Sequence, residues 1–209
     1  FARDTAMRTL DDACVNADAF IGLSGSNLLT PEALLTMAPK PIIFACNGPA
    51  VGIGASMQLP GDIRIASEDA RFGFVFNNRG IVPDACSSWF LPKIVGISKA
   101  LDLTFSGRII DSQEALDISL ISSIHKPENL IHDAINIAQA LVEKSAPISI
   151  AITRQMLWRS FGQTDPYDAH VIESKAIDSR GASDDAREGV NSFLEKRPAK
   201  FKNLISSDM

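Results

Sequence analysis

The sequence predicts a mixed α/β fold in which a core of short strands and helices precedes a helical C-terminal part. Short apolar runs such as 42–45 and 63–66 are bounded by turn residues, as is typical of buried strands. Farther along, apolar residues recur at the spacing of a helix, for example over 127–144. We therefore expect an α/β core domain over residues 1–125 and a helical region over 126–209.

The expected elements follow the chain in order. Residues 1–18 favour an amphipathic helix, and Thr30-Pro31-Glu32 is a typical start of a short helix after a loop. Residues 62–75 predict two short strands around a polar turn. Further helices are expected over 85–91, 98–105, 112–119, 127–144, 146–161, 165–179 and 185–195, with an edge strand over 120–125. Asp185 and Glu188 stand at the spacing of a capping box for the last helix.

Composition excludes several classes of protein. The chain has 209 residues, of which 45% are apolar, and a net charge of −5, so it lacks the basic stripe that nucleic acids require. No apolar run reaches the roughly 18 residues of a membrane span. The three histidines lack the spacing of metal ligands, so no metal site is expected. The three cysteines (Cys14, Cys46 and Cys86) predict reduced, buried thiols.

The most informative segment runs from Pro39 to Asp62. A short apolar strand leads through Asn47-Gly48 into small residues at 50, 52, 54 and 55. Residues with little or no side chain let backbone N–H groups approach a ligand, and the first N–H groups of a following helix lack acceptors within it. The pattern therefore predicts a binding turn for an anion or a developing oxyanion. A tight strand-to-helix turn without a ligand has the same pattern, and this alternative stays open.

Five segments in order resemble the crotonase, or enoyl-CoA hydratase/isomerase, superfamily. They are PKPIIFACNGPAVGIGASMQLPGD, DIRIASEDARFGFV, RGIVPDACSSWFLPKIVG, SGRIIDSQEAL and DDAREGVNSFLEKRPAKF, and together they span residues 39–201. The resemblance implies a spiral of ββα turns with a helical, oligomerising C-terminal part. It also implies an acyl-CoA thioester as substrate, no further cofactor, and a homotrimer or a dimer of trimers.

The resemblance also implies where a substrate binds. The backbone N–H of Ile53 would help to hold the thioester oxygen, and Ala50, Gly52 and Gly54 would line the same turn. Phe76 and Trp89 are further candidate substrate-binding residues, and these aromatic side chains suggest a filled or narrowed acyl site. Lys196 matches a family position that contacts the phosphates of coenzyme A, although a solvated basic helix end explains it as well.

The family's two catalytic glutamates are absent, because Ser56 and Phe76 stand at their positions. One carboxylate remains nearby, Asp84, in a V-P-D-A-C-S-S-W segment that resembles the peroxisomal Δ3,Δ2-enoyl-CoA isomerases. Asp84 is therefore expected to shuttle a proton between two carbons, or else to cap the helix over 85–91. Glu68 and Asp69 suit a solvated turn, Asp62 suits a structural role, and no histidine lies near Ser56 in sequence to activate its hydroxyl.

Other functions and locations stay open at this stage. The chain could carry out another crotonase reaction, such as hydration or hydrolysis of a thioester or C–C bond, or could bind acyl-CoA as a scaffold without catalysis. The strands that open a crotonase fold do not appear before Pro39, so we expect about the first quarter of a typical member, with one oxyanion donor, to lie outside this chain. The ending Ser207-Asp208-Met209 is not a peroxisomal signal of the S-K-L type. The expected location is the cytoplasm or the peroxisome.

Overall fold

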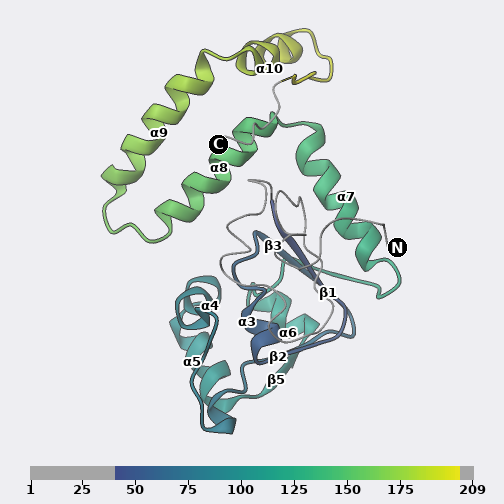
Figure 1. Ribbon diagram of the computed structural model, residues 1–209. Coiled ribbons are helices and arrows are strands. Elements are labelled where there is room, and N and C mark those ends of the chain that lie inside the picture. Colours follow the sequence, from purple (N-terminus) through teal and green to yellow (C-terminus); the bar gives the residue numbers. More distant parts are fainter. Residues whose placement is uncertain (1–40, 203–209) are drawn as a thin grey trace, which may run out of the picture. The chain divides into compact units, whose positions relative to one another are not determined.

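A computed structural model of the chain describes residues 41–202. They form two compact units, one of residues 42–136 and one of residues 137–202 with Pro41, and each is described by itself (Figure 1). The helices expected before residue 40, and Cys14, lie outside the described residues.

The first sheet of the first unit has three parallel strands in the order β1 (Ile43–Cys46), β3 (Ile63–Ser67) and β6 (Ser123–His125). The expected pairing of the first two apolar runs is confirmed, since Ile43 lies opposite Ile63 in the parallel register. β1 is buried along its whole length, as expected of a parallel strand covered on both faces. The expected edge strand is present as β6, at one end of the strand order.

Two polar side chains hold the ends of this sheet together. The Ile42 N–H donates to the Asp62 carboxylate at 2.6 Å, and the Asp62 N–H donates to the Ile42 carbonyl at 3.0 Å. Arg64 donates to the carbonyls of Gly61 and Leu120 at 2.7 and 2.8 Å. The structural role expected of Asp62 is therefore observed, and the D-I-R-I-A motif ties the start of β3 to its neighbours.

The second sheet contains β2 (Pro49–Val51), β4 (Arg71–Gly73) and β5 (Ile109–Asp111). β2 pairs parallel with β4, and β4 pairs antiparallel with β5. A β-carbon on Gly73 would stand 2.4 Å from Cδ1 of Ile109, the end of a flexible side chain, so a larger residue here would require Ile109 to move.

Helices cover the two sheets and share one hydrophobic core with them. They are α3 (Ile53–Ser56), α4 (Ser87–Val95), α5 (Ile97–Ser106) and α6 (Ser112–Asp117), with a 3₁₀ turn η1 (Asn77–Arg79). Ala55 of α3, Leu91 of α4, Leu103 of α5 and Phe76 belong to the same buried cluster. The segments that carry the candidate site are therefore anchored to a common core.

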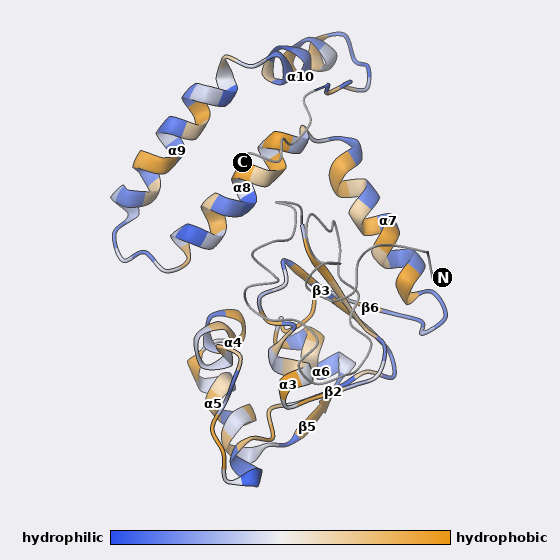
Figure 2. Ribbon diagram, viewed as in Figure 1, coloured by the Kyte–Doolittle hydropathy of each residue, from blue (hydrophilic) through white to orange (hydrophobic). Residues whose placement is uncertain are grey.

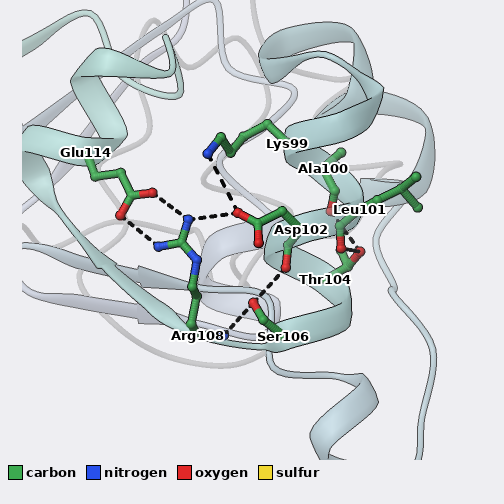
Figure 3. A network of polar contacts seen from close by, with 8 residues as sticks. All are labelled: Lys99, Ala100, Leu101, Asp102, Thr104, Ser106, Arg108 and Glu114. Carbon is green, nitrogen blue, oxygen red and sulfur yellow. Dashed lines mark hydrogen bonds and ion pairs between the residues drawn. The ribbon is translucent and has the colours of Figure 1, made fainter.

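A charged network around Arg108, which directly precedes β5, joins α5 to α6 (Figure 3). The Arg108 guanidinium binds the Glu114 carboxylate through both of its terminal nitrogens and also contacts Asp102 at 2.9 Å. This contact lowers the pKa of both carboxyl groups. Asp111 caps α6 by accepting from the Glu114 N–H at 2.8 Å. The G-R-I-I-D-S-Q-E motif thus has a structural role, because its side chains connect α5 to α6 and cap α6.

Four helices follow β6 within the described residues: α7 (Leu130–Glu143), α8 (Pro147–Ser160), α9 (Pro166–Gly181) and α10 (Asp184–Leu194). All four were expected, and α7 runs across the boundary between the units. Hydrophilic and hydrophobic residues are mixed along α9, which buries no residue completely (Figure 2). The predicted cap of α10 was wrong: Ser183 accepts from the Ala186 N–H at 3.2 Å, and Asp185 lies buried inside the helix.

Candidate active site

The glycine turn leads directly from β2 into α3. Gly52 adopts φ 59° and ψ −123°, and its N–H donates to the Gly73 carbonyl at 2.8 Å. Its carbonyl accepts from Ala55 and Ser56 at 3.0 and 3.1 Å, which closes the first turn of the helix. Within residues 41–202, no acceptor takes the N–H groups of Ile53 and Gly54. The turn therefore presents two adjacent backbone donors, as an oxyanion site requires.

Gly54 leaves open space above this turn. A β-carbon at this position would meet no atom of the described chain within 4 Å, and its φ is not positive. Neither packing nor backbone geometry in this part of the chain therefore requires glycine, although glycine in a helix costs about 0.5–1 kcal/mol relative to alanine. Ala50, by contrast, is buried at the centre of β2 and faces the core.

The positions of the two family glutamates are both buried. Ser56 is fully buried, and its hydroxyl has no hydrogen-bond partner in the described chain. Phe76 is 4% exposed and packs in the core, with its Cε1 atom 4.0 Å from where a β-carbon on Gly52 would stand. Phe76 therefore forms part of the floor under the turn, and neither residue supplies an acid or a base.

The predicted cap at Asp84 was wrong. The α4 helix begins at Ser87, its N-cap residue is Cys86, and no side chain caps it. Both Ala85 and Cys86 adopt left-handed backbone conformations, with φ 46° and 57°, which separate Asp84 from the helix. This left-handed pair could not be read from the sequence because alanine and cysteine rarely adopt it.

The Asp84 side chain is exposed, and its carboxylate contacts no hydrogen-bond donor or cation among the described residues. Its carbonyl, in contrast, accepts from both the N–H and the hydroxyl of Ser87, at 2.8 and 2.6 Å. The backbone of this residue is therefore fixed while its carboxylate stays available.

Aromatic and thiol side chains line the start of α4. Trp89 is 40% exposed, meets Phe90 edge-on with ring centroids 4.7 Å apart, and carries the Lys93 ammonium 3.6 Å above its ring. Cys86 is exposed, so the expectation of a buried thiol was wrong there. Cys46 is buried as expected, and burial raises its pKa.

Lys196 occupies a constrained position in the second unit. The Lys196 N–H donates to the Phe193 carbonyl and the Arg197 N–H to the Ser192 carbonyl, at 3.2 and 3.0 Å, which is the Schellman motif that ends a helix. Its φ of 55° is one that glycine usually adopts there. The neighbouring Arg197 binds the Glu188 carboxylate through both terminal nitrogens at 2.6 and 2.9 Å, so it is engaged in structure.

Two further properties bear on the site. Within residues 41–202, no cluster of three or more metal-ligating side chains is present. No helix of the described chain is long and apolar enough to cross a membrane.

The sequence reasoning missed one polar arrangement. Ser123 and His125 of β6 and Asp133 of α7 form a continuous hydrogen-bonded chain. The Ser-x-His spacing on one strand is the signal that could have shown the first link. The contact with α7 arises only from the fold.

Comparison with known proteins identifies the family. The profile of the enoyl-CoA hydratase/isomerase family matches residues 8–204. The crystal structure of a probable enoyl-CoA hydratase/isomerase from Mycobacterium abscessus aligns over 87% of this chain and 72% of that one, with TM-score 0.77 and 28% identity. The crotonase fold expected from the sequence is thus confirmed. The chain belongs to the enoyl-CoA hydratase/isomerase family.

Two curated relatives illustrate the range of reactions in this family. "Enoyl-CoA hydratase ACTT3" of Alternaria alternata is 39% identical over 167 residues, which are 79% of this chain and 56% of that protein. "1,2-epoxyphenylacetyl-CoA isomerase" of Escherichia coli K12 is 32% identical over 183 residues, or 87% of this chain and 69% of that protein. The chain spans little more than half the length of the first relative.

Proposed function

We propose that this protein is an acyl-CoA-processing enzyme that moves a double bond, as a Δ3,Δ2-enoyl-CoA isomerase does. The observation that carries the proposal is the distribution of carboxylates. Ser56 and Phe76 are buried and cannot transfer protons, whereas Asp84 is exposed and its carboxylate has no partner among residues 41–202. An allylic shift needs one base and no bound water, whereas hydration needs a second group to handle the water.

In the proposed reaction, the Asp84 carboxylate removes a proton from C2 of a 3-enoyl thioester and returns it to C4. The charge that develops on the thioester oxygen is stabilised by the N–H of Ile53, whose donor is free in the described chain. Donors fixed before the reaction stabilise such an enolate without reorganisation, and this effect is typically the largest catalytic contribution. Phe76 supports the turn from below, and Trp89, which is 40% exposed, would contact the acyl chain.

Coenzyme A itself would be bound through Lys196. Lys196 matches the family position that contacts the phosphates of coenzyme A, and it adopts a left-handed conformation that costs a lysine about 1–2 kcal/mol of backbone strain. A homotrimer or a dimer of trimers is part of this proposal, because family members assemble that way.

Hydration is the second candidate, since the Alternaria relative bears the name "Enoyl-CoA hydratase ACTT3" and a Bacillus subtilis relative the name "Probable enoyl-CoA hydratase". The two reactions can be separated with two substrates. A 3-enoyl-CoA should be converted to its 2-enoyl isomer, measured by the rise in absorbance of the conjugated thioester. A 2-enoyl-CoA should not lose that absorbance through hydration. Binding of both thioesters without turnover of either would instead identify an acyl-CoA scaffold.

A further inference from the structure

Three side chains far from the glycine turn in sequence, a hydroxyl, an imidazole and a carboxylate, are joined by two hydrogen bonds. Oγ of Ser123 lies 2.7 Å from Nε2 of His125, and Nδ1 of His125 lies 2.7 Å from Oδ2 of Asp133. Ser123 and His125 are two positions apart on β6 and so face the same side of the sheet. Asp133 reaches them from the first turn of α7.

The chemistry of the acceptors fixes the direction of both bonds. An ionised carboxylate only accepts, so Nδ1 of His125 carries the proton and donates it to Asp133. The neutral imidazole then has a bare Nε2, which accepts from the Ser123 hydroxyl. This is the arrangement in which a histidine takes the proton of a serine while a carboxylate orients the ring.

The three residues are reachable from solvent. The side chains of His125 and Asp133 are 18% and 32% exposed, and β6 stands at one end of its sheet. The hydroxyl of Ser123 has no other partner within the described residues. A role limited to fastening α7 to the sheet would need only the bond between His125 and Asp133, which leaves the serine unexplained.

We propose that Ser123, His125 and Asp133 form a second site, which accepts acyl groups from small esters. The Ser123 oxygen attacks the ester carbonyl while its proton passes to Nε2 of His125. The bond to the leaving alcohol then breaks, and the alcohol takes the proton from His125. Water, deprotonated by the same nitrogen, releases the acid and restores Ser123. This site shares no residue with the isomerase proposed above, so either can fail without the other.

The site can be tested on the 209-residue chain with a fluorophosphonate, which forms a P–O bond to an activated serine and releases fluoride. Peptide mass spectrometry should find the label on Ser123. Hydrolysis of p-nitrophenyl acetate, followed by release of p-nitrophenol, should be abolished in Ser123→Ala. Ser122→Ala is the matched control, because the Ser122 hydroxyl donates to the Arg64 carbonyl and not to a base.

The orienting acid gives a second, independent readout. Asp133→Asn can still hydrogen-bond but no longer fixes the tautomer of His125, so labelling of Ser123 should slow by about 10² or more. Thermal melting shows whether each variant is folded. The identification of Ser123 as the labelled residue uses the wild-type chain, so it holds even if a variant does not fold. A label absent from Ser123, or an equal labelling rate in Asp133→Asn, would overturn the proposal.

Discussion

The Phe76 ring lies directly against the Gly52 turn, with Cε1 4.0 Å from the position of a β-carbon on Gly52. The position at which the family resemblance implies a glutamate is therefore occupied by an apolar side chain that supports the glycine turn. This relationship ties the stability of the core to the geometry of the donors above it. It also leaves Asp84 as the carboxylate on which the proposed chemistry depends.

Phe76→Ala should lower the free energy of unfolding by about 3–5 kcal/mol, because it opens a cavity in a well-packed core. Phe105 is 67% exposed, so Phe105→Ala should change stability by no more than about 0.5 kcal/mol. Urea unfolding followed by circular dichroism measures both. Equal effects of the two substitutions would show that Phe76 does not support the core.

Substitutions at the two turn glycines should separate folding from binding. Gly54→Ala should keep or raise stability, because φ is not positive and the space is open, yet should weaken binding of an acyl-CoA that approaches this turn. Gly52→Ala should destabilise the protein, since it forces alanine to φ 59°. Melting temperature and isothermal titration with acyl-CoA report the two effects. Unchanged affinity in Gly54→Ala would mean that the ligand does not enter that space.

Lys196→Gly should raise stability by about 1 kcal/mol, because it relieves a left-handed lysine. It should also weaken binding of coenzyme A by about tenfold if the ammonium contacts a phosphate. Ser119 provides the control: it adopts φ 62° in the same motif after α6, where the Leu120 N–H donates to the Ala115 carbonyl. Ser119→Gly should stabilise the protein equally with no effect on affinity. If Lys196→Gly leaves the affinity for coenzyme A unchanged, Lys196 does not contact the ligand and is only a solvated residue at the end of a helix.

The ion pair between Glu188 and Arg197 should make the stability of the protein depend on pH in the acidic range. Hydrogen bonds from Arg197 and the Lys200 N–H lower the pKa of Glu188 from 4.5 to about 2. The carboxylate is thus favoured in the folded state, so its stabilising contribution is complete above pH 4.5 and is lost as the pH falls toward about 2. The melting temperature of Glu188→Gln should lie below that of the parent at neutral pH, and the difference should shrink in this acidic range. Glu173→Gln, on an exposed part of α9, should show no such trend.

The elements that sequence reasoning placed correctly are those set by local pattern. The apolar runs of β1 and β3 and the helical spacing of α7 specify strands and helices without knowledge of their partners. The predicted cap of α10 failed because two neighbouring residues carry equivalent capping signals, and only the tertiary structure determines which of them stands at the start of the helix. Ser183 and Asp185 are both capable helix caps, and only the chain's path buries Asp185 and leaves Ser183 at the helix start.

The candidate site divides in the same way. The donors of the glycine turn follow from a local sequence motif, whereas the start of α4 depends on two left-handed residues, Ala85 and Cys86, that no propensity favours. The contact of His125 with Asp133 likewise requires a turn between β6 and α7 that brings strand and helix together. Contacts between elements are not encoded in the spacing within either one.

The most direct test of the central claim is the turnover of a 3-enoyl-CoA by Asp84→Asn. The substitution preserves side-chain size and removes basicity. Because the Asp84 carboxylate has no partner within the part of the chain that the structure describes, the melting temperature should not change. Asp69→Asn, in the exposed turn before β4, is the matched control. If Asp84 is the base, turnover should fall by at least about 10²-fold while acyl-CoA affinity stays the same and Asp69→Asn retains full activity. Turnover in Asp84→Asn equal to that of the parent would contradict the assignment of Asp84 as the proton shuttle.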